Sequence, residues 1–230
     1  MISYKGGLEN GMITDRETAS PVGRVEQRGI SPGVLLRQTG LLAMAAGVST
    51  FLSPILHPDD PGSAAWVPAH LLFFATLIAV LLVLVGVFVR QLPRSGRLLG
   101  LAGFLAAFVG TSMMLMEGRE HLFSHDFGQG TPVGLWQLIA TSLVFSVGYI
   151  LLGVAIFRAG VLPRGAGVLL AVGGPIVAFS PPLGILTVLF VGHTLFGAGL
   201  AWLGYALFFS SRDAARRNVG RQTAADATIR

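Results

Sequence analysis

Histidines are the residues of this chain best suited to chemistry. They are His57, His70, His121, His125 and His193. His193 interrupts an apolar segment, where an ionisable side chain is costly and usually faces a partner or a cavity. His70 stands near the start of another apolar segment. Because imidazole binds metal ions and haem iron, these two residues indicate a site in apolar surroundings.

A second group of suitable residues lies in one short polar stretch. Glu117, His121 and His125 follow one another at intervals of four, so they share a face if a helix continues through them. Two histidines four apart can chelate one metal ion, and the preceding Met113 and Met114 favour Cu(I). The alternative interpretation is the solvated end of a helix whose methionines pack in the core.

Apolar segments must position these residues. A helix needs about 20 apolar residues to cross a bilayer, and 53% of the 230 residues are hydrophobic while 12% are charged. Soluble domains average about 25% charged residues. The sequence therefore predicts an all-α fold, a polytopic integral membrane helical bundle of six transmembrane helices. They are predicted at residues 34–55, 67–89, 98–116, 133–157, 167–179 and 183–209.

The chain divides into three predicted parts. Residues 1–33 are polar and are predicted to be a disordered cytoplasmic tail, residues 34–209 form the transmembrane domain, and residues 210–230 form a cytoplasmic C-terminal tail. The fifth segment is short and carries Gly173, Gly174 and Pro175 in its middle. Since proline removes a backbone donor, we expect this helix to be kinked or partly unwound.

The basic residues predict the orientation. With six spans, 15 of the 16 lysines and arginines fall on one side, and Arg119 alone falls on the other. The positive-inside rule then places both termini in the cytoplasm of a multi-pass protein of the cell membrane. The sequence pI of about 10.7 does not indicate nucleic acid as a partner, because the arginines cluster at helix ends and tails.

Similar segments recur along the chain. Leu-Pro-Arg begins at Leu92 and again at Leu162, each time just before a predicted span, and residues 32–37 form a looser third copy. The recurrence indicates three repeated helical hairpins with one common orientation. Three small-residue pairs are typical of close helix contacts. They are Ala43 with Gly47, Ser142 with Ser146 and Gly197 with Ala201.

The even-numbered spans carry polar residues at one depth. His70, Gln137 and His193 lie 20, 21 and 19 residues before the arginine that ends their own span. At 1.5 Å per residue the spread in height is about 3 Å. We therefore expect His70 and His193, together with Glu117, to converge on one pocket in the outer half of the membrane, with Gln137 as a further cofactor contact.

The sequence leaves three functions open. In the first, the outward-facing pocket binds a metal ion or a haem-like cofactor through His70, His193 and Glu117, with His121 and His125 as further metal ligands. In the second, an intramembrane enzyme acts on a lipid or isoprenoid substrate, with Glu117 as catalytic acid or with a metal held by the histidines and by Asp59 or Asp60. In the third, the chain is a non-catalytic structural, assembly or sensing subunit that contacts the lipid bilayer and other membrane subunits.

Several classes of function are excluded by missing residues. The chain has no cysteine, which excludes thiolate metal sites, Fe–S clusters and covalently attached haem. It has no phosphate-binding Gly-rich loop, dinucleotide fingerprint or GxSxG elbow. Its predicted spans contain no lysine, so no retinal Schiff base forms there. No histidine lies on the predicted inner side, which excludes a relay of two haems across the membrane.

Overall fold

The computed structural model describes residues 32–56, 63–91, 97–127, 134–183 and 185–228. Side chains are described within 33–56, 63–91, 98–119, 134–180 and 185–209. Every regular element in these ranges is a helix, as predicted. The helices are α1 (Pro32–Leu56), α2 (Trp66–Gln91), α3 (Arg97–Phe127), α4 (Leu135–Ala159), α5 (Arg164–Leu183) and α6 (Leu186–Thr228).

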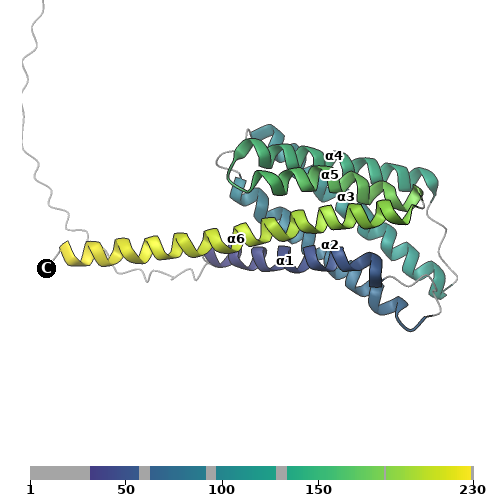
Figure 1. Ribbon diagram of the computed structural model, residues 1–230, viewed down its shortest axis with the longest axis horizontal. Helices are drawn as coiled ribbons and strands as arrows, with labels where there is room; N and C mark the ends of the chain where they lie inside the picture. The colour runs from purple at the N-terminus through teal and green to yellow at the C-terminus, as the bar shows by residue number, and fades with distance from the viewer. Residues whose placement is uncertain (1–31, 57–62, 92–96, 128–133, 184, 229–230) are drawn as a thin grey trace, which may run out of the picture. The chain divides into compact units, whose positions relative to one another are not determined.

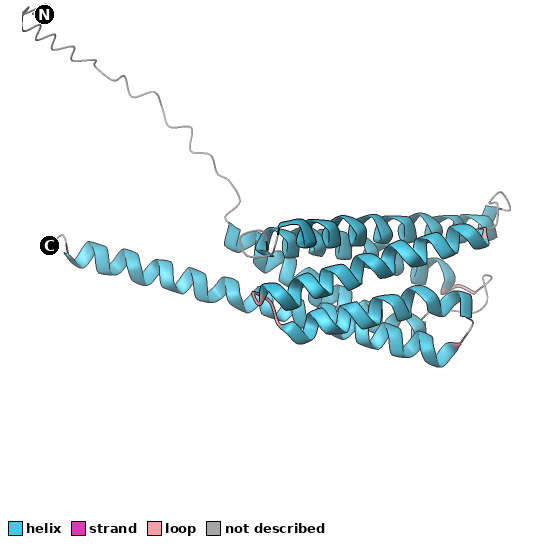
Figure 2. Ribbon diagram, turned by 90° about the horizontal axis from the view of Figure 1, so that it is seen from above, coloured by secondary structure: helices cyan, strands magenta, loops and turns pink. Residues whose placement is uncertain are grey.

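The six helices form a ring in the order of the sequence. Each helix packs against its sequence neighbours, and α6 packs against α1 to close the ring. Figures 1 and 2 show the helices running side by side. Neighbours run in opposite directions: Thr39 of α1 packs at Gly86 of α2, while Ser49 further along α1 contacts the earlier Thr76. Helices α1, α3 and α5 therefore share one direction, as three repeated hairpins require.

Within the described ranges, five helices are long and apolar enough to cross a membrane, namely α1, α2, α3, α4 and α6. Helix α5 is shorter, as its sequence suggested, yet it lies against long stretches of both neighbours. On the α4 side Gly167 meets Gly153 and Gly174 meets Tyr149, while on the α6 side Gly173 meets Phe196. Helix α5 thus shares its height in the ring with the apolar parts of α4 and α6.

The expectation that the fifth helix is partly unwound is wrong. Helix α5 is one unbroken α-helix through Gly173, Gly174 and Pro175. A Cβ atom on Gly173 would lie 2.6 Å from the backbone nitrogen of Phe196, and one on Gly174 would lie 2.8 Å from the Cβ of Tyr149. The two glycines thus let α4 and α6 approach closely from both sides, and this packing holds the helix through the proline.

Alternating directions place arginines of several helices at one end of the ring. This arginine end carries Arg37 of α1, Arg90 of α2, Arg158 of α4 and Arg164 of α5. The opposite end, called the histidine end here, carries Trp66, His70, Glu117, Arg119 and His193. The guanidinium carbon of Arg37 lies 5.2 Å from the centre of the Phe208 ring, and that of Arg164 lies 5.4 Å from the centre of the Phe157 ring. The aromatic side chains thus brace the basic ones near the ends of the apolar segments.

Glycines join α1 to α6 over much of their shared length. A Cβ atom on Gly47 would lie 2.5 Å from the carbonyl oxygen of Gly197 and 2.7 Å from the backbone nitrogen of Ala201. At the next contact Gly40 faces Gly204, and Ala43 is fully buried beside it. The contacts predicted for Gly47, Gly197 and Ala201 are confirmed, and Ser142 likewise donates a hydrogen bond to the Ala178 carbonyl of α5 at 2.7 Å.

Two helices extend beyond the predicted spans. Helix α3 continues to Phe127, and α6 continues to Thr228, so residues 210–228 of the predicted C-terminal tail are helical. Figure 1 shows the yellow C-terminal part of α6 extending beyond the N-terminal end of α1. The predicted N-terminal tail lies outside the described residues except for its last two positions.

Candidate functional site

A small cavity lies inside the ring, toward the histidine end. Its volume is about 40 Å³, which is room for about three water molecules. All six helices contribute to its wall. The lining residues are Ser49, Thr50, Ser53, Leu56, Ala69, Leu72, Phe73, Thr76, Leu77, Val80, Met114, Phe145, Val177, His193 and Phe196. The wall is therefore mostly apolar, with hydroxyl groups from α1 and α2 and an imidazole from α6.

His193 is the one ionisable residue among the described residues that line the cavity. It lies in the second turn of α6, and its Nδ1 is 2.8 Å from the carbonyl oxygen of Leu189, one turn back. A carbonyl oxygen only accepts, so Nδ1 carries the hydrogen in the neutral ring and Nε2 carries the lone pair. Histidines that bind metals are held in this way, with the second ring nitrogen donating to a carbonyl or carboxylate. His193 is thus oriented as a ligand would be.

Hydroxyl groups occupy the wall formed by α1 and α2. Ser49 Oγ lies 2.6 Å from Thr76 Oγ1, and Thr76 donates to the Leu72 carbonyl at 2.8 Å. Since the Thr76 hydrogen is used there, Ser49 donates to Thr76. The Thr50 hydroxyl donates to the Ala46 carbonyl at 2.8 Å. This part of the wall therefore offers only neutral hydroxyl oxygens, which are weak ligands for a metal ion.

A proline adds a backbone acceptor next to the cavity. Pro54 lies inside α1 and has no N–H, so the carbonyl of Thr50, four residues earlier, lacks its helical donor. Thr50 and Ser53 both line the cavity. The Thr50 carbonyl belongs to the same turn of α1 as these two hydroxyl groups.

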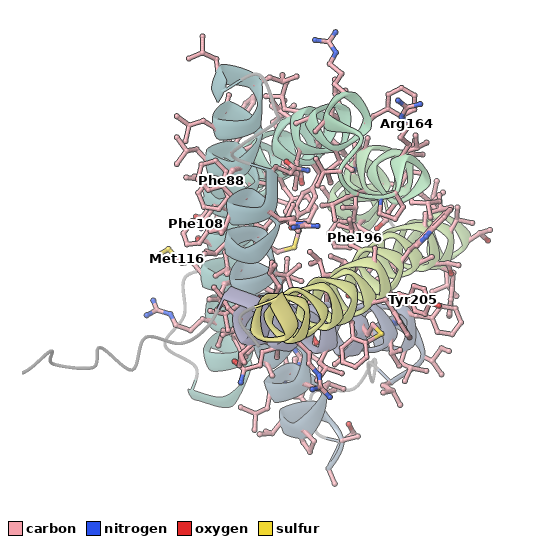
Figure 3. All side chains as sticks on the ribbon, turned by 90° about the vertical axis from the view of Figure 1, so that its left-hand side faces the viewer. Phe88, Phe108, Met116, Arg164, Phe196 and Tyr205 are labelled. Atoms are coloured by element: carbon pink, nitrogen blue, oxygen red, sulfur yellow. The ribbon has the colours of Figure 1, made fainter. Side chains whose placement is uncertain are left out.

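Aromatic rings close the cavity toward the arginine end. The ring centres of Phe145 and Phe196 are 5.7 Å apart, and Tyr149 packs on both rings at 4.5 and 4.8 Å. The Tyr149 hydroxyl lies 3.0 Å from the Thr111 hydroxyl of α3. Figure 3 shows the Phe196 side chain pointing into the space between the helices, whereas Met116 and Tyr205 point outward. Beyond these rings Val83, Leu84 and Leu203 are buried, and the polar Thr39 and Gln91 are buried closer to the arginine end. Among the described residues the cavity is thus a one-sided pocket, separated by apolar side chains from those polar ones.

His70 resembles His193 in its bonding but differs in its surroundings. Its Nδ1 lies 2.9 Å from the Trp66 carbonyl, and its ring centre lies 4.2 Å from that of Trp66. Counting along the antiparallel contacts of α1 with α2 and α6 places His70 and His193 within about one helical turn in height. His70 is 2% exposed, yet it is not among the residues that line the cavity.

The other predicted site residues lie around the histidine end. Glu117 is half-buried on α3, one turn beyond Met114, and the adjacent Gly118 packs on Phe73 of α2. Gln137 is exposed in the first turn of α4. Helix α3 continues through the positions of His121 and His125, so the interval of four does place them and Glu117 on one helical face.

Part of the predicted metal site lies outside the described residues. This holds for His57, Asp59 and Asp60 entirely, and for the side chains of His121 and His125. Within the part of the chain whose side chains are described, no group of three or more His, Asp or Glu residues is arranged to hold a metal ion.

The contribution of the hydroxyl residues to this site was not anticipated from the sequence, and Met114 had been connected with His121 and His125 and not with His193. Serine and threonine are common in membrane helices, so their presence alone indicated nothing. A usable signal was Pro54 in α1, flanked by Ser49, Thr50 and Ser53, because a proline with nearby hydroxyl residues often marks a polar position in a span.

The fold and the cavity define a polytopic α-helical membrane protein with a small one-sided pocket. No family profile matches the chain, and neither the curated proteins nor the solved structures contain a match to it.

Proposed function

We propose that this chain is a six-span membrane protein that binds one metal ion in its cavity, with His193 as a ligand. The observation that carries this proposal is the His193 imidazole in the cavity wall, with Nδ1 committed to the Leu189 carbonyl and Nε2 left with its lone pair. An ionisable side chain is costly in a span, and binding a ligand is one way to offset that cost.

Helix α5 counts as a crossing helix in this proposal. It packs along α4 and α6, both of which are long enough to cross, and its 20 residues span about 30 Å. With six crossings, the positive-inside rule places the arginine end on the cytoplasmic side of the cell membrane. The cavity then lies in the outer half and opens outward.

The cavity favours a metal ion over the other guests considered. A haem or an isoprenoid occupies a pocket of several hundred Å³, whereas this cavity measures about 40 Å³. Glu117, the acid that an enzyme acting on lipids would use, is not among the residues that line the cavity. A single ion therefore fits this small cavity better than a cofactor or a lipid.

Metal analysis of the purified full-length protein tests the proposal. After loading in mild detergent with Cu(I), Zn²⁺, Co²⁺ or Ni²⁺ in turn and gel filtration, we expect about one ion per chain of at least one metal. The His193→Ala variant should lose that ion, and the His70→Ala variant should keep it. If no metal is retained, or if retention does not depend on His193, the proposal is wrong, and a non-catalytic subunit becomes the better interpretation.

A further inference from the structure

We propose that the guest of the cavity is Cu(I), held by the Sδ atom of Met114 and the Nε2 atom of His193. This inference rests on the proposed function of the same cavity and names its ligand. Met114 comes from α3 and His193 from α6, so only the closing of the ring brings both to one cavity. The sequence had connected Met114 with His121 and His125, its neighbours along α3.

The donor atoms favour a soft ion. Thioether sulfur and neutral imidazole are ligands that select Cu(I), whereas Mg²⁺, Ca²⁺ and Mn²⁺ prefer carboxylate and carbonyl oxygens. Among the residues that the structure describes, no aspartate, glutamate or arginine lines the cavity. The remaining polar groups are the hydroxyls of Ser49, Thr50, Ser53 and Thr76, of which Ser49, Thr50 and Thr76 donate hydrogen bonds within the protein.

The charge of the ion gives an independent argument. The cost of moving an ion from water into an apolar interior rises with the square of its charge, and it is already large for a single charge. The described residues of the cavity wall include no carboxylate to compensate a second charge. A monovalent ion is therefore far less costly to place there than Zn²⁺ or Ni²⁺.

The two phenylalanine rings of the cavity wall add a further favourable interaction with a bound cation. Phe145 and Phe196 both line the cavity, and their ring centres are 5.7 Å apart. A cation near the face of an aromatic ring is attracted by the ring quadrupole, more strongly where water is excluded.

Divalent zinc would also require a tetrahedral set of ligands, which the described residues of this cavity do not supply.

The competing explanation is that Met114 only fills space. Methionine is a common filler of irregular gaps in cores, and in that case leucine should replace it without any effect on metal binding. Met113 provides a matched control, because it is adjacent, half-buried and not a lining residue.

The test is a Cu(I) competition titration on full-length protein in detergent, under reducing conditions, against a coloured Cu(I) chelator. We expect one high-affinity Cu(I) site that Met114→Leu weakens by at least about tenfold and that Met113→Leu leaves unchanged. His193→Ala should abolish the site. X-ray absorption at the copper edge on selenomethionine-labelled, otherwise unaltered protein should show a Cu–Se contact, which makes the test independent of the folding of any variant.

Each other outcome decides against the assignment. Equal Cu(I) affinity in Met114→Leu and wild type, or a copper spectrum without selenium, overturns the copper inference and leaves metal binding by His193 standing. Retention of Zn²⁺ or Ni²⁺ through His193 in preference to Cu(I) likewise overturns the copper inference but not metal binding by His193. Cu(I) binding that survives both Met114→Leu and His193→Ala is adventitious and overturns the assignment, and a protein that retains no metal overturns the proposed function as well.

Discussion

The hydroxyl of Ser49 on α1 donates to the hydroxyl of Thr76 on α2 across 2.6 Å, at the wall of the cavity that His193 also lines. The direction follows from the second bond of Thr76, which donates to the Leu72 carbonyl. The bond joins α1 and α2, which also meet where Thr39 packs at Gly86. It therefore fixes the hydroxyl side of the site with respect to the rest of the ring.

A double-mutant cycle on this pair should show coupling. Interhelical hydrogen bonds in membrane proteins contribute about 0.6 kcal/mol on average and up to about 1.7 kcal/mol. We expect Ser49→Ala and Thr76→Val to be non-additive by an amount in that range, measured by unfolding in detergent. Ser112→Ala serves as the control, because Ser112 donates only to Phe108 of its own helix at 2.8 Å. Fully additive effects would show that the bond contributes nothing to stability.

Replacing Gly197 by leucine should destabilise the protein strongly. A Cβ atom there would lie 2.6 Å from the carbonyl oxygen of Gly47, so α1 and α6 would have to separate. Overpacking of a well-packed core costs about 1–3 kcal/mol, and a clash with backbone should reach at least that range. The neighbouring Ala198 is exposed, so Ala198→Leu should have little effect. Equal melting temperatures for the two variants would refute the importance of the α1–α6 contact.

His70→Ala should affect stability while leaving the cavity intact. The substitution removes a buried side chain that bonds the Trp66 carbonyl and packs on the indole ring. A loss of about 1–3 kcal/mol is expected from such a buried partner, measured by thermal unfolding of the metal-free protein. If instead His70→Ala abolishes metal binding and unfolds at the wild-type temperature, the two histidines share one site as their depths suggested.

Reporter fusions test the six crossings. A cytoplasmic reporter attached after Arg230 should be active, and the same reporter inserted between residues 128 and 133 should be inactive, since that loop follows three crossings. A reporter that is exported when fused at the C-terminus would show that α5 does not cross, or that the orientation is reversed. Insertion at the turn around Gly160 separates these two cases, because that turn is cytoplasmic only in the predicted orientation.

The membrane segments were readable from the sequence because the bilayer imposes one requirement on all of them. Apolar runs of sufficient length located five spans and marked the fifth segment as the weakest. The same reasoning missed the ends of α3 and α6, which continue to Phe127 and Thr228. Hydropathy reports the thickness of the hydrocarbon and not the length of the helix, so polar helical extensions are invisible to it.

The site was only partly predictable, and the reason is geometric. Counting residues from the arginines gives the height of His70 and His193, but not the direction in which each side chain leaves its helix. His193 lines the cavity, whereas His70, at a similar height, packs on Trp66. The partnership of His193 with Met114 depends on how α3 and α6 are rotated about their axes, which the packing of all six helices determines together.

The closing contact between the first and last helices has a consequence for biosynthesis. Gly47 of α1 packs against Gly197 of α6. Because Gly197 comes much later in the sequence, it is made long after Gly47 has been inserted. At synthesis rates of about 5–20 residues per second, this interval is roughly 8–30 s. Throughout that time α1 presents Gly40 and Gly47 to lipid or to α2 alone. A nascent chain that stalls before α6 would carry an unpaired glycine stripe, a feature by which membrane quality control could distinguish it from the finished protein.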